Sequence, residues 1–546
     1  MSRHSAPTGG QVWQWFEQGA GHHRLTGLYD NTERAHRFFL GEQWYGVESG
    51  GEALPQYNFI QPIVEHKVAS VAMNNMTISY TPLEHAGQAY QRAALLCRQL
   101  TTYAARQWER LKMDKLCWSA VRDACVAGDG YLYFYDGDCH AQQVDTCNLY
   151  LADEQCADLQ KQEYILIAGR QTVGSLRREA RRAGLRESDV EKIVPDDGQW
   201  EQERERQEAA RDEPERKCTA LLLFWRDENG IVCCQRSTRD VVYRPAARLC
   251  GSGGRGLRLY PVAGLSWLRR RGSALGGGGV QGLIANQIET NKMLARRLMN
   301  AKVSAFSRLV YNADKVMNKE AVEQVGAAIK VRDMQASSVS DIVTYLGAAP
   351  MSPDARQLSE ELVTMTRELA GAGNAALGQV NPELASGAAI IAARDQAALP
   401  LNGQIADFRQ FIEDVAAIWF ELWCAYYPRD LQEGPYGMDA EELGRLQVEI
   451  RIDVAPNNPL SRYAQEQALE NLFARGSITL EEYVEALDET AAAPKQKLEG
   501  ILESRRQGAT KGKPGGGFAP APSGAEDLAE LIYAKSIQSK GVPSGA

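Results

Sequence analysis

The segment 276–427 constrains the fold more than any other, because it holds three helical patterns separated by two kinds of break. It opens with four consecutive glycines, which lead into a predicted helix over 280–303. Apolar residues recur at helical spacing over 352–370 and predict a second helix. A segment of mixed character lies between the two. Together these patterns predict an elaborate helical scaffold.

The second break is a loop over 371–387 that is rich in glycine and small residues. Its glycines permit motion that a packed element would forbid. A third helix is predicted over 388–427, with a proline near its first third. Because proline removes a backbone donor, it predicts a kink in that helix. The predicted hinge positions are Gly276, Gly277, Gly278, Gly279 and Pro400.

The chain lacks the common catalytic motifs. It has no G-x-x-x-x-G-K-[ST] phosphate loop, no H-E-x-x-H zinc motif and no G-x-S-x-G nucleophile turn. Asp136 with Asp138, and Asp153 with Glu154, could hold Mg²⁺, but turn chemistry explains both pairs more simply. We therefore expect no enzyme activity, no cofactor and no metal.

Composition and net charge narrow the class of protein further. Hydrophobic residues make up 44% of the chain and charged residues 24%, which is ordinary for a soluble globular protein. A net charge of −9 argues against a monomer that binds nucleic acid through one broad basic face. The best apolar stretch, 415–427, is too short to cross a bilayer and carries Glu421, so we expect no membrane partner. Eleven cysteines without a C-x-x-C pair predict reduced, mostly buried thiols.

Helical and strand patterns alternate through the rest of the chain. Helices are predicted over 11–46, 88–112 and 114–127, the last of them ended by Gly128. The clearest hairpin is ALLLFWRDENGIVCCQRS, with Glu-Asn-Gly as its turn. MTISYTP and LQVEIRIDVAP alternate like strands. The expected fold class is α+β and mainly helical.

Three N-terminal phrases resemble the portal proteins of tailed bacteriophages. The first is Phe38-Phe39-Leu40-Gly41-Glu42-Gln43-Trp44, the second an anchoring Asn58 before a helix and a short strand, and the third WSAVRDACVAGDGYLYFYDGD. The order of elements in 276–427 is similar to the stem, clip and tunnel loop of that family. Together with the N-terminal phrases and the predicted crown, the resemblance covers roughly 25–505.

The resemblance implies a portal-like division of the chain. The expected regions are the wing (1–275), the first stem helix (276–303), the clip (304–351), the second stem helix (352–370), the tunnel loop (371–387), a long kinked helix with a wing strand (388–460), the crown (461–506) and a flexible C-terminal tail (507–546).

The resemblance also implies a function. Such a chain would form a ring, by family likeness of twelve subunits, at one vertex of a virion capsid after assembly in the host cytoplasm. Double-stranded DNA would pass through it without sequence preference during packaging and ejection. The other implied partners are the large terminase subunit, the major capsid and scaffolding proteins, and head–tail adaptor or tail proteins.

Two sets of residues are candidates for contact with DNA or with neighbouring components. The tunnel loop would present Asn374, Leu377, Gln379, Asn381 and Glu383 to DNA. Basic residues of the predicted stem and clip are Lys292, Arg296, Arg297, Lys302, Arg308, Lys315, Lys319, Lys330 and Arg332. These basic residues suit either a salt-bridged or solvated face or contact with phosphates. The competing hypotheses are a Mg²⁺-dependent nucleic-acid-processing enzyme and a virion scaffold protein that is not a portal.

Overall fold

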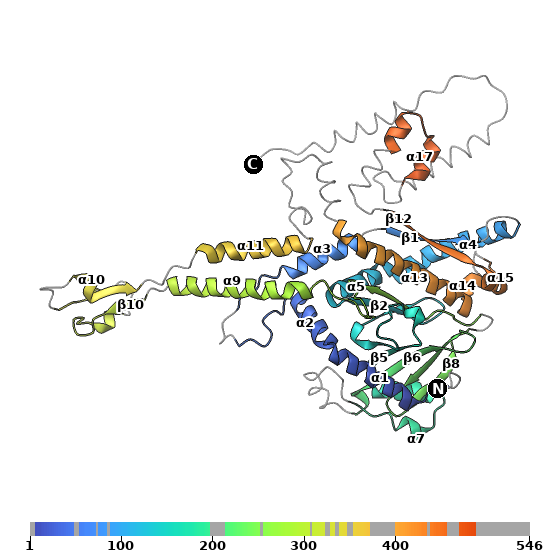
Figure 1. The fold of residues 1–546 in the computed structure, drawn as a ribbon, viewed down its shortest axis with the longest axis horizontal. Helices are drawn as coiled ribbons and strands as arrows, with labels where there is room; N and C mark the ends of the chain where they lie inside the picture. Colours follow the sequence, from blue (N-terminus) through green and yellow to red (C-terminus); the bar gives the residue numbers. More distant parts are fainter. Residues whose placement is uncertain are drawn as a thin grey trace, which may run out of the picture. The chain divides into compact units, whose positions relative to one another are not determined.

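A computed structural model describes residues 6–48, 54–72, 75–83, 88–196, 213–251, 255–305, 308–322, 328–332, 338–346, 353–371, 399–433, 437–455 and 469–487. The chain divides into two units, Met1–Asn458 and Pro459–Ala546. The larger unit combines helices with antiparallel sheets (Figure 1), which confirms the predicted α+β class.

Two helices open the larger unit, α1 (Gly9–Leu25) and α2 (Leu28–Leu40). The sequence predicts continuous helix here, but the chain breaks at Gly27. Its φ of +66° lies in the left-handed region that favours glycine. The α1 helix starts with a capping box between Thr8 and Gln11.

Three more helices supply apolar faces to the main core: α3 (Ile60–Ala72), α4 (Gln88–Leu111) and α5 (Met113–Ala127). Along α5, Ala120, Val121 and Ala124 are fully buried. Their small volume lets α5 contact both α3 and the strand that follows it. The helix ends at Gly128, as predicted, and the Gly128 N–H donates to the Ala124 carbonyl.

A five-stranded antiparallel sheet has the order β4-β5-β6-β7-β8. Its strands are β4 (Leu149–Leu151), β5 (Tyr164–Thr172), β6 (Lys217–Arg226), β7 (Val232–Ser237) and β8 (Val242–Arg248). Pairing of β6 with β7 confirms the predicted hairpin, and Gly230 takes a left-handed φ of +72° in its turn.

Helices contact both faces of this sheet. On one face, Leu221 and Leu223 pack with Phe16 of α1. On the other, Cys218 and Ala220 pack with α6 (Val173–Arg182), beside the short α7 (Glu187–Val190). The two sets separate because successive side chains along β6 point to opposite faces.

A three-stranded sheet has the order β3-β2-β9, with strands β2 (Asp129–Phe134), β3 (Ala141–Val144) and β9 (Val262–Ser266). Strand β2 follows α5 directly. The register places Asp129 opposite Ser266. This pairing brings the end of α5 next to the chain that leads into the predicted stem.

A two-stranded sheet joins distant parts of the larger unit. Strand β1 (Asn75–Pro82) pairs antiparallel with β12 (Val448–Ala455), and both strands were predicted. The Tyr80 hydroxyl donates to the Ala416 carbonyl at 2.9 Å, which ties β1 to the central helix α13.

Helix α13 (Asn402–Tyr426) carries the largest buried side chains of the main core, Trp419 and Trp423. Pro400 lies in the 3₁₀ turn η6 (Leu399–Leu401) directly before it. Residues 388–398 lie outside the described residues, so the predicted kink inside a longer helix stays a prediction. The short helices α14 (Arg429–Glu433) and α15 (Ala440–Arg445) follow.

The segments predicted as stem and clip lie in the larger unit. Helix α9 (Ile284–Ala305) follows the 3₁₀ turn η4 (Gln281–Leu283), and α11 (Pro353–Leu369) is the second helix. Between them come β10 (Arg308–Tyr311), η5 (Lys319–Val322), α10 (Val339–Ile342) and β11 (Val343–Leu346). Strands β10 and β11 pair antiparallel, so this intervening segment has its own small sheet.

In the smaller unit the structure describes residues 469–487. Helix α17 (Leu480–Ala486) begins with the predicted capping box, in which Thr479 and Glu482 bond each other's backbone. The rings of Phe473 and Tyr483 lie 5.1 Å apart. The rest of the predicted crown and the C-terminal tail lie outside the described residues.

Candidate functional site at the base of the paired helices

Helices α9 and α11 lie side by side (Figure 1), with the small sheet inserted between them in the chain. The Asn286 side chain, near the start of α9, donates to the Thr366 hydroxyl, near the end of α11, at 2.9 Å. The two helices therefore run antiparallel. Thr366 is 1% exposed, so this hydrogen bond lies inside the contact.

Large apolar side chains remain exposed on this helix pair: Leu298, Met299, Leu358, Met365 and Leu369. Single exposed apolar residues are ordinary on protein surfaces. Here several occur on two adjacent helices, and Met365 is 57% exposed and Leu369 85% exposed. Large apolar side chains left exposed on both helices indicate a surface that another chain could cover.

Three of the four glycines before α9 (Gly276, Gly278 and Gly279) are packed against the backbone at the end of α5, whereas Gly277 faces the Arg270 side chain. The Gly279 N–H donates to the Cys125 carbonyl at 2.8 Å. A Cβ on Gly278 would lie 2.3 Å from the Val126 carbonyl oxygen, and one on Gly276 would lie 2.9 Å from the Gly128 carbonyl oxygen. Close approach of two backbones therefore explains glycine at these positions. Whether the run also moves as a hinge stays a prediction.

Asp129 holds the first glycine of this run. Its carboxylate accepts hydrogen bonds from the Gly276 N–H at 2.8 Å and from the Ser266 hydroxyl. The side chain is 1% exposed, and this burial raises its pKa from 3.8 to about 6. The two hydrogen bonds and nearby Arg270 act in the opposite direction, because they stabilise the ionised form.

A buried polar network fixes the first turns of α9 to the N-terminal part of the chain. The Gln287 side chain, fully buried, accepts from the Phe59 N–H at 3.1 Å and donates to the Tyr57 carbonyl at 2.6 Å. The Asn291 side chain accepts from the Tyr57 N–H and donates to the Gln43 side chain. Each of these buried polar groups is thereby satisfied.

The residues that carry the family resemblance lie at this same base. Gln43 continues the network by donating to the Phe38 carbonyl. Asn58 donates to the Phe39 carbonyl, and its side-chain oxygen accepts from the Gln61 N–H at the start of α3. The N-terminal phrase is therefore a scaffold for the start of α9.

Gln287, Asn291 and Asp129 were not singled out from the sequence. Gln287 and Asn291 lie four residues apart, on the helical face that also carries the buried Leu283 and Ile284. Two amide side chains on the apolar face of a predicted helix indicate a buried polar network, so this signal was present in the sequence. Asp129 carries no such local sign, because its partners are far away in the sequence.

The basic residues predicted for the first stem helix lie along α9. Lys292 forms an ion pair with Glu289 at 2.8 Å on the exposed side of α9. Arg296 and Lys302 are also exposed, and Arg297 is half-buried. The side chain of Arg308 lies outside the described residues.

The basic residues of the predicted clip lie in the segment that joins α9 to α11. Lys315 and Arg332 are joined through their backbones, with the Arg332 N–H donating to the Lys315 carbonyl at 2.8 Å. The Lys330 N–H donates to the Asn318 side chain at 2.7 Å. The side chains of Lys330 and Arg332 are exposed, and that of Lys319 lies outside the described residues.

The tunnel-loop residues predicted to face DNA all lie outside the described residues: Asn374, Leu377, Gln379, Asn381 and Glu383. Their contact with DNA stays a prediction.

The acidic pairs considered for Mg²⁺ take part in turns and ion pairs. Asp136 accepts from the His140 N–H and contacts the His140 ring at 2.8 Å, and Asp138 lies 3.5 Å from Arg110. Asp153 accepts from the Gln155 N–H. Across the described ranges no group of three or more His, Cys, Asp or Glu side chains is arranged to hold a metal ion.

No helix in the described part of the chain combines the length and apolar character that a bilayer-spanning segment needs. No protein-family model matches this chain, and no curated protein matches its sequence.

Proposed function

We propose that this chain is the subunit of a portal ring that conducts double-stranded DNA into and out of a bacteriophage capsid. The observation that carries the proposal is the pair α9 and α11: two antiparallel helices, interrupted by a small sheet, with large apolar side chains exposed along them. A stem and clip of a ring subunit would have this construction.

The exposed apolar residues support assembly into a ring. In a monomer, Leu298, Met299 and Met365 would leave apolar surface in water. Burial of apolar surface stabilises an interface by about 25 cal/mol for each Å² removed from water. A ring offers every subunit the same neighbour on each side, so one set of exposed residues is covered in all copies.

The base of α9 supports the mechanical part of the proposal. A subunit that transmits force along a stem needs a rigid junction between the stem and the body. The buried amides of Gln287 and Asn291 hydrogen-bond the start of α9 to Phe59 and Tyr57. Asp129 holds Gly276, just before α9, in the same way. Satisfied buried polar networks rigidify a structure.

The negative net charge of the chain is compatible with a channel that does not bind DNA tightly. Many phosphate contacts would produce tight, salt-dependent binding and would slow DNA movement. A net charge of −9 per subunit limits such adhesion. In this proposal the clip receives the terminase large subunit, which supplies ATP hydrolysis, while capsid, scaffolding, adaptor and tail proteins bind elsewhere on the ring.

Electron microscopy and native mass spectrometry of the purified full chain test the proposal. We expect rings with a central hole and a mass of many subunits. Leu298→Glu is expected to prevent ring formation, because it places a charge in the proposed interface. Leu25→Glu, at an 86% exposed apolar position on α1, is the matched control and should assemble normally. Monomers across a range of salt concentrations, from a folded wild-type protein, would exclude a portal.

A further inference from the structure

Helix α9 has an exposed face that is mainly basic. Lys292, Arg296 and Met299 follow one another at spacings of four and three residues, and all three are exposed. Such spacing places side chains on one side of a helix. Gln287 and Asn291, by contrast, are buried and mark the side of α9 that is bonded to the N-terminal segment. The basic face is therefore open to a partner.

The exposed face of α11 is apolar and acidic. Leu358, Met365 and Leu369 recur at spacings of seven and four residues, and each is more than half exposed. Glu361 and Glu368, both exposed, follow Leu358 and Met365 by three residues and so lie on the same side of the helix. This face combines a strip of apolar surface with negative charge along its edge.

The net charges of the two helices are opposite in sign. Helix α9 contains four basic residues and one acidic residue, whereas α11 contains four acidic and two basic residues. Two surfaces that combine apolar side chains with opposite charge are complementary to each other. One chain therefore carries both halves of a contact that a second copy can complete.

The two faces also lie at matching heights along the helix pair, which Figure 1 shows side by side. The hydrogen bond between Asn286 and Thr366 sets the level of one antiparallel helix against the other. Both helices rise about 1.5 Å per residue. Lys292, six residues beyond Asn286, is therefore level with the residue next to Glu361. Rotation about an axis parallel to the helices keeps these heights, so Lys292 of one copy would be level with Glu361 of the next.

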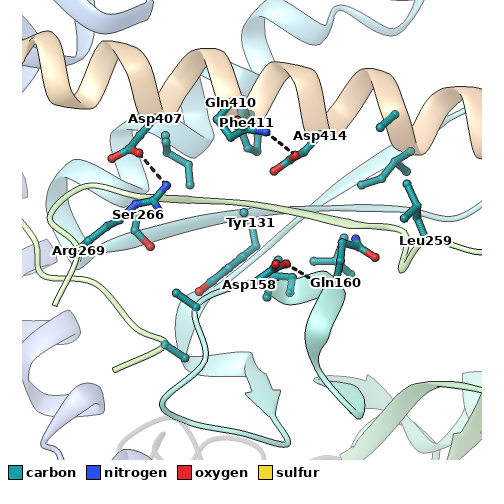
Figure 2. A pocket seen from close by; sticks show the side chains of 18 residues that line it. Tyr131, Asp158, Gln160, Leu259, Ser266, Arg269, Asp407, Gln410, Phe411 and Asp414 are labelled. Carbon is teal, nitrogen blue, oxygen red and sulfur yellow. Dashed lines mark hydrogen bonds and ion pairs between the residues drawn. The ribbon is translucent and has the colours of Figure 1, made fainter. Parts of the chain in front are cut away.

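The cavity of about 410 Å³ beside α13 (Figure 2) offers a partner much less apolar surface. Its lining residues Phe411 and Ile418 are 0% and 1% exposed. Asp407, which also lines it, is already paired with Arg269, as the dashed line in Figure 2 shows. The helix pair is therefore the better surface for a partner.

We propose that the exposed face of α9 in one copy of the chain binds the exposed face of α11 in the next copy. The contact rests on the proposed ring function and makes it head-to-tail, because two different surfaces of the chain meet. Leu358 and Met365 would be removed from water, and Lys292 would pair with Glu361. The present partner of Lys292, Glu289, is exposed, and exposed ion pairs contribute little, so this exchange costs little.

Sedimentation velocity of charge-reversed full chains tests the contact. The α9 variant carries Lys292→Glu with Arg296→Glu, and the α11 variant carries Glu361→Lys with Glu368→Lys. Each alone should associate about tenfold more weakly than the wild type, because its two faces then carry charge of the same sign. An equimolar mixture should associate like the wild type, since the two reversed faces attract each other and so do the two unaltered faces.

Arg178→Glu with Arg182→Glu is the matched control. It makes the same change in net charge at two exposed positions of α6, outside the helix pair. This variant should associate like the wild type. Thermal unfolding of every variant confirms that it is folded.

Two results would overturn the proposed contact: wild-type association by either folded variant, or a mixture that associates no better than its components. If the wild type still forms rings in electron microscopy, the portal function survives that failure. Open oligomers of the wild type that follow the expected pattern would support the contact and count against the portal. A wild type that stays monomeric would exclude both.

Discussion

The carboxylate of Asp129 accepts a hydrogen bond from the backbone N–H of Gly276 at 2.8 Å, across 147 residues of sequence. Asp129 begins strand β2, directly after α5, and Gly276 begins the glycine run that leads into α9. This contact fixes the origin of the paired helices to the core of the larger unit. It also makes stability at this junction sensitive to pH.

The pH dependence of unfolding should report on Asp129. Its folded-state pKa is raised to about 6, so the folded protein binds this proton more tightly than the unfolded chain. The resulting stabilisation is complete below about pH 4 and is lost as the pH rises through about 6. The expected loss is about 2–3 kcal/mol. Asp129→Asn should flatten this part of the curve of melting temperature against pH.

The exposed Asp189→Asn is the control for the Asp129 experiment, because its carboxylate lies on α7, away from the junction. It should leave the slope between about pH 4 and pH 6 unchanged. An unchanged slope in Asp129→Asn would show that the buried carboxylate does not titrate in this range.

Glycine at position 278 is expected to be needed for full stability of the folded chain. In Gly278→Ala the new methyl group would meet the Val126 carbonyl oxygen at 2.3 Å, so the backbones of the glycine run and α5 must separate. The expected cost is about 1–3 kcal/mol of unfolding free energy. Gly282→Ala is the matched control, since nothing lies within 4 Å of its added Cβ. Equal melting temperatures for the two variants would contradict the packing role.

Loss of the Gln287 amide should weaken the attachment of α9. Gln287→Leu keeps a side chain of similar size but leaves the Phe59 N–H and the Tyr57 carbonyl without this partner. Each buried group left unsatisfied costs about 1–3 kcal/mol. Chemical denaturation measures the change, with the exposed Gln357→Leu of α11 as control. A loss no greater than that of the control would mean that the network is not needed for stability.

Thiol reactivity should single out Cys250. It is the exposed cysteine of the native chain, whereas burial raises the pKa of Cys97 to about 11 and of Cys125 to about 12. Because the thiolate is the reactive form, a maleimide at neutral pH should modify Cys250 first. Peptide mapping by mass spectrometry identifies the site, and Cys250→Ser should abolish the fast phase. Rapid modification of Cys125 in the folded protein would contradict the predicted core.

Several elements were predictable because their patterns are local. Helices α4, α5, α9 and α11 follow apolar residues at helical spacing, and the β6–β7 hairpin follows strand alternation around Asn229-Gly230. The break at Gly27 was missed, because the helical patterns on its two sides read as one.

The sequence by itself determined the α+β class, the positions of helices α4, α5, α9 and α11, the β6–β7 hairpin, strands β1 and β12, and the glycine run. Each of these depends on neighbours within a few residues. Only the tertiary structure decided what those glycines touch, that β1 pairs with β12, and that Gln287 reaches Tyr57. The physical reason is distance along the chain. Asp129 and Gly276 meet because two strands and a helix end bring them together, and no residue near either one encodes the other.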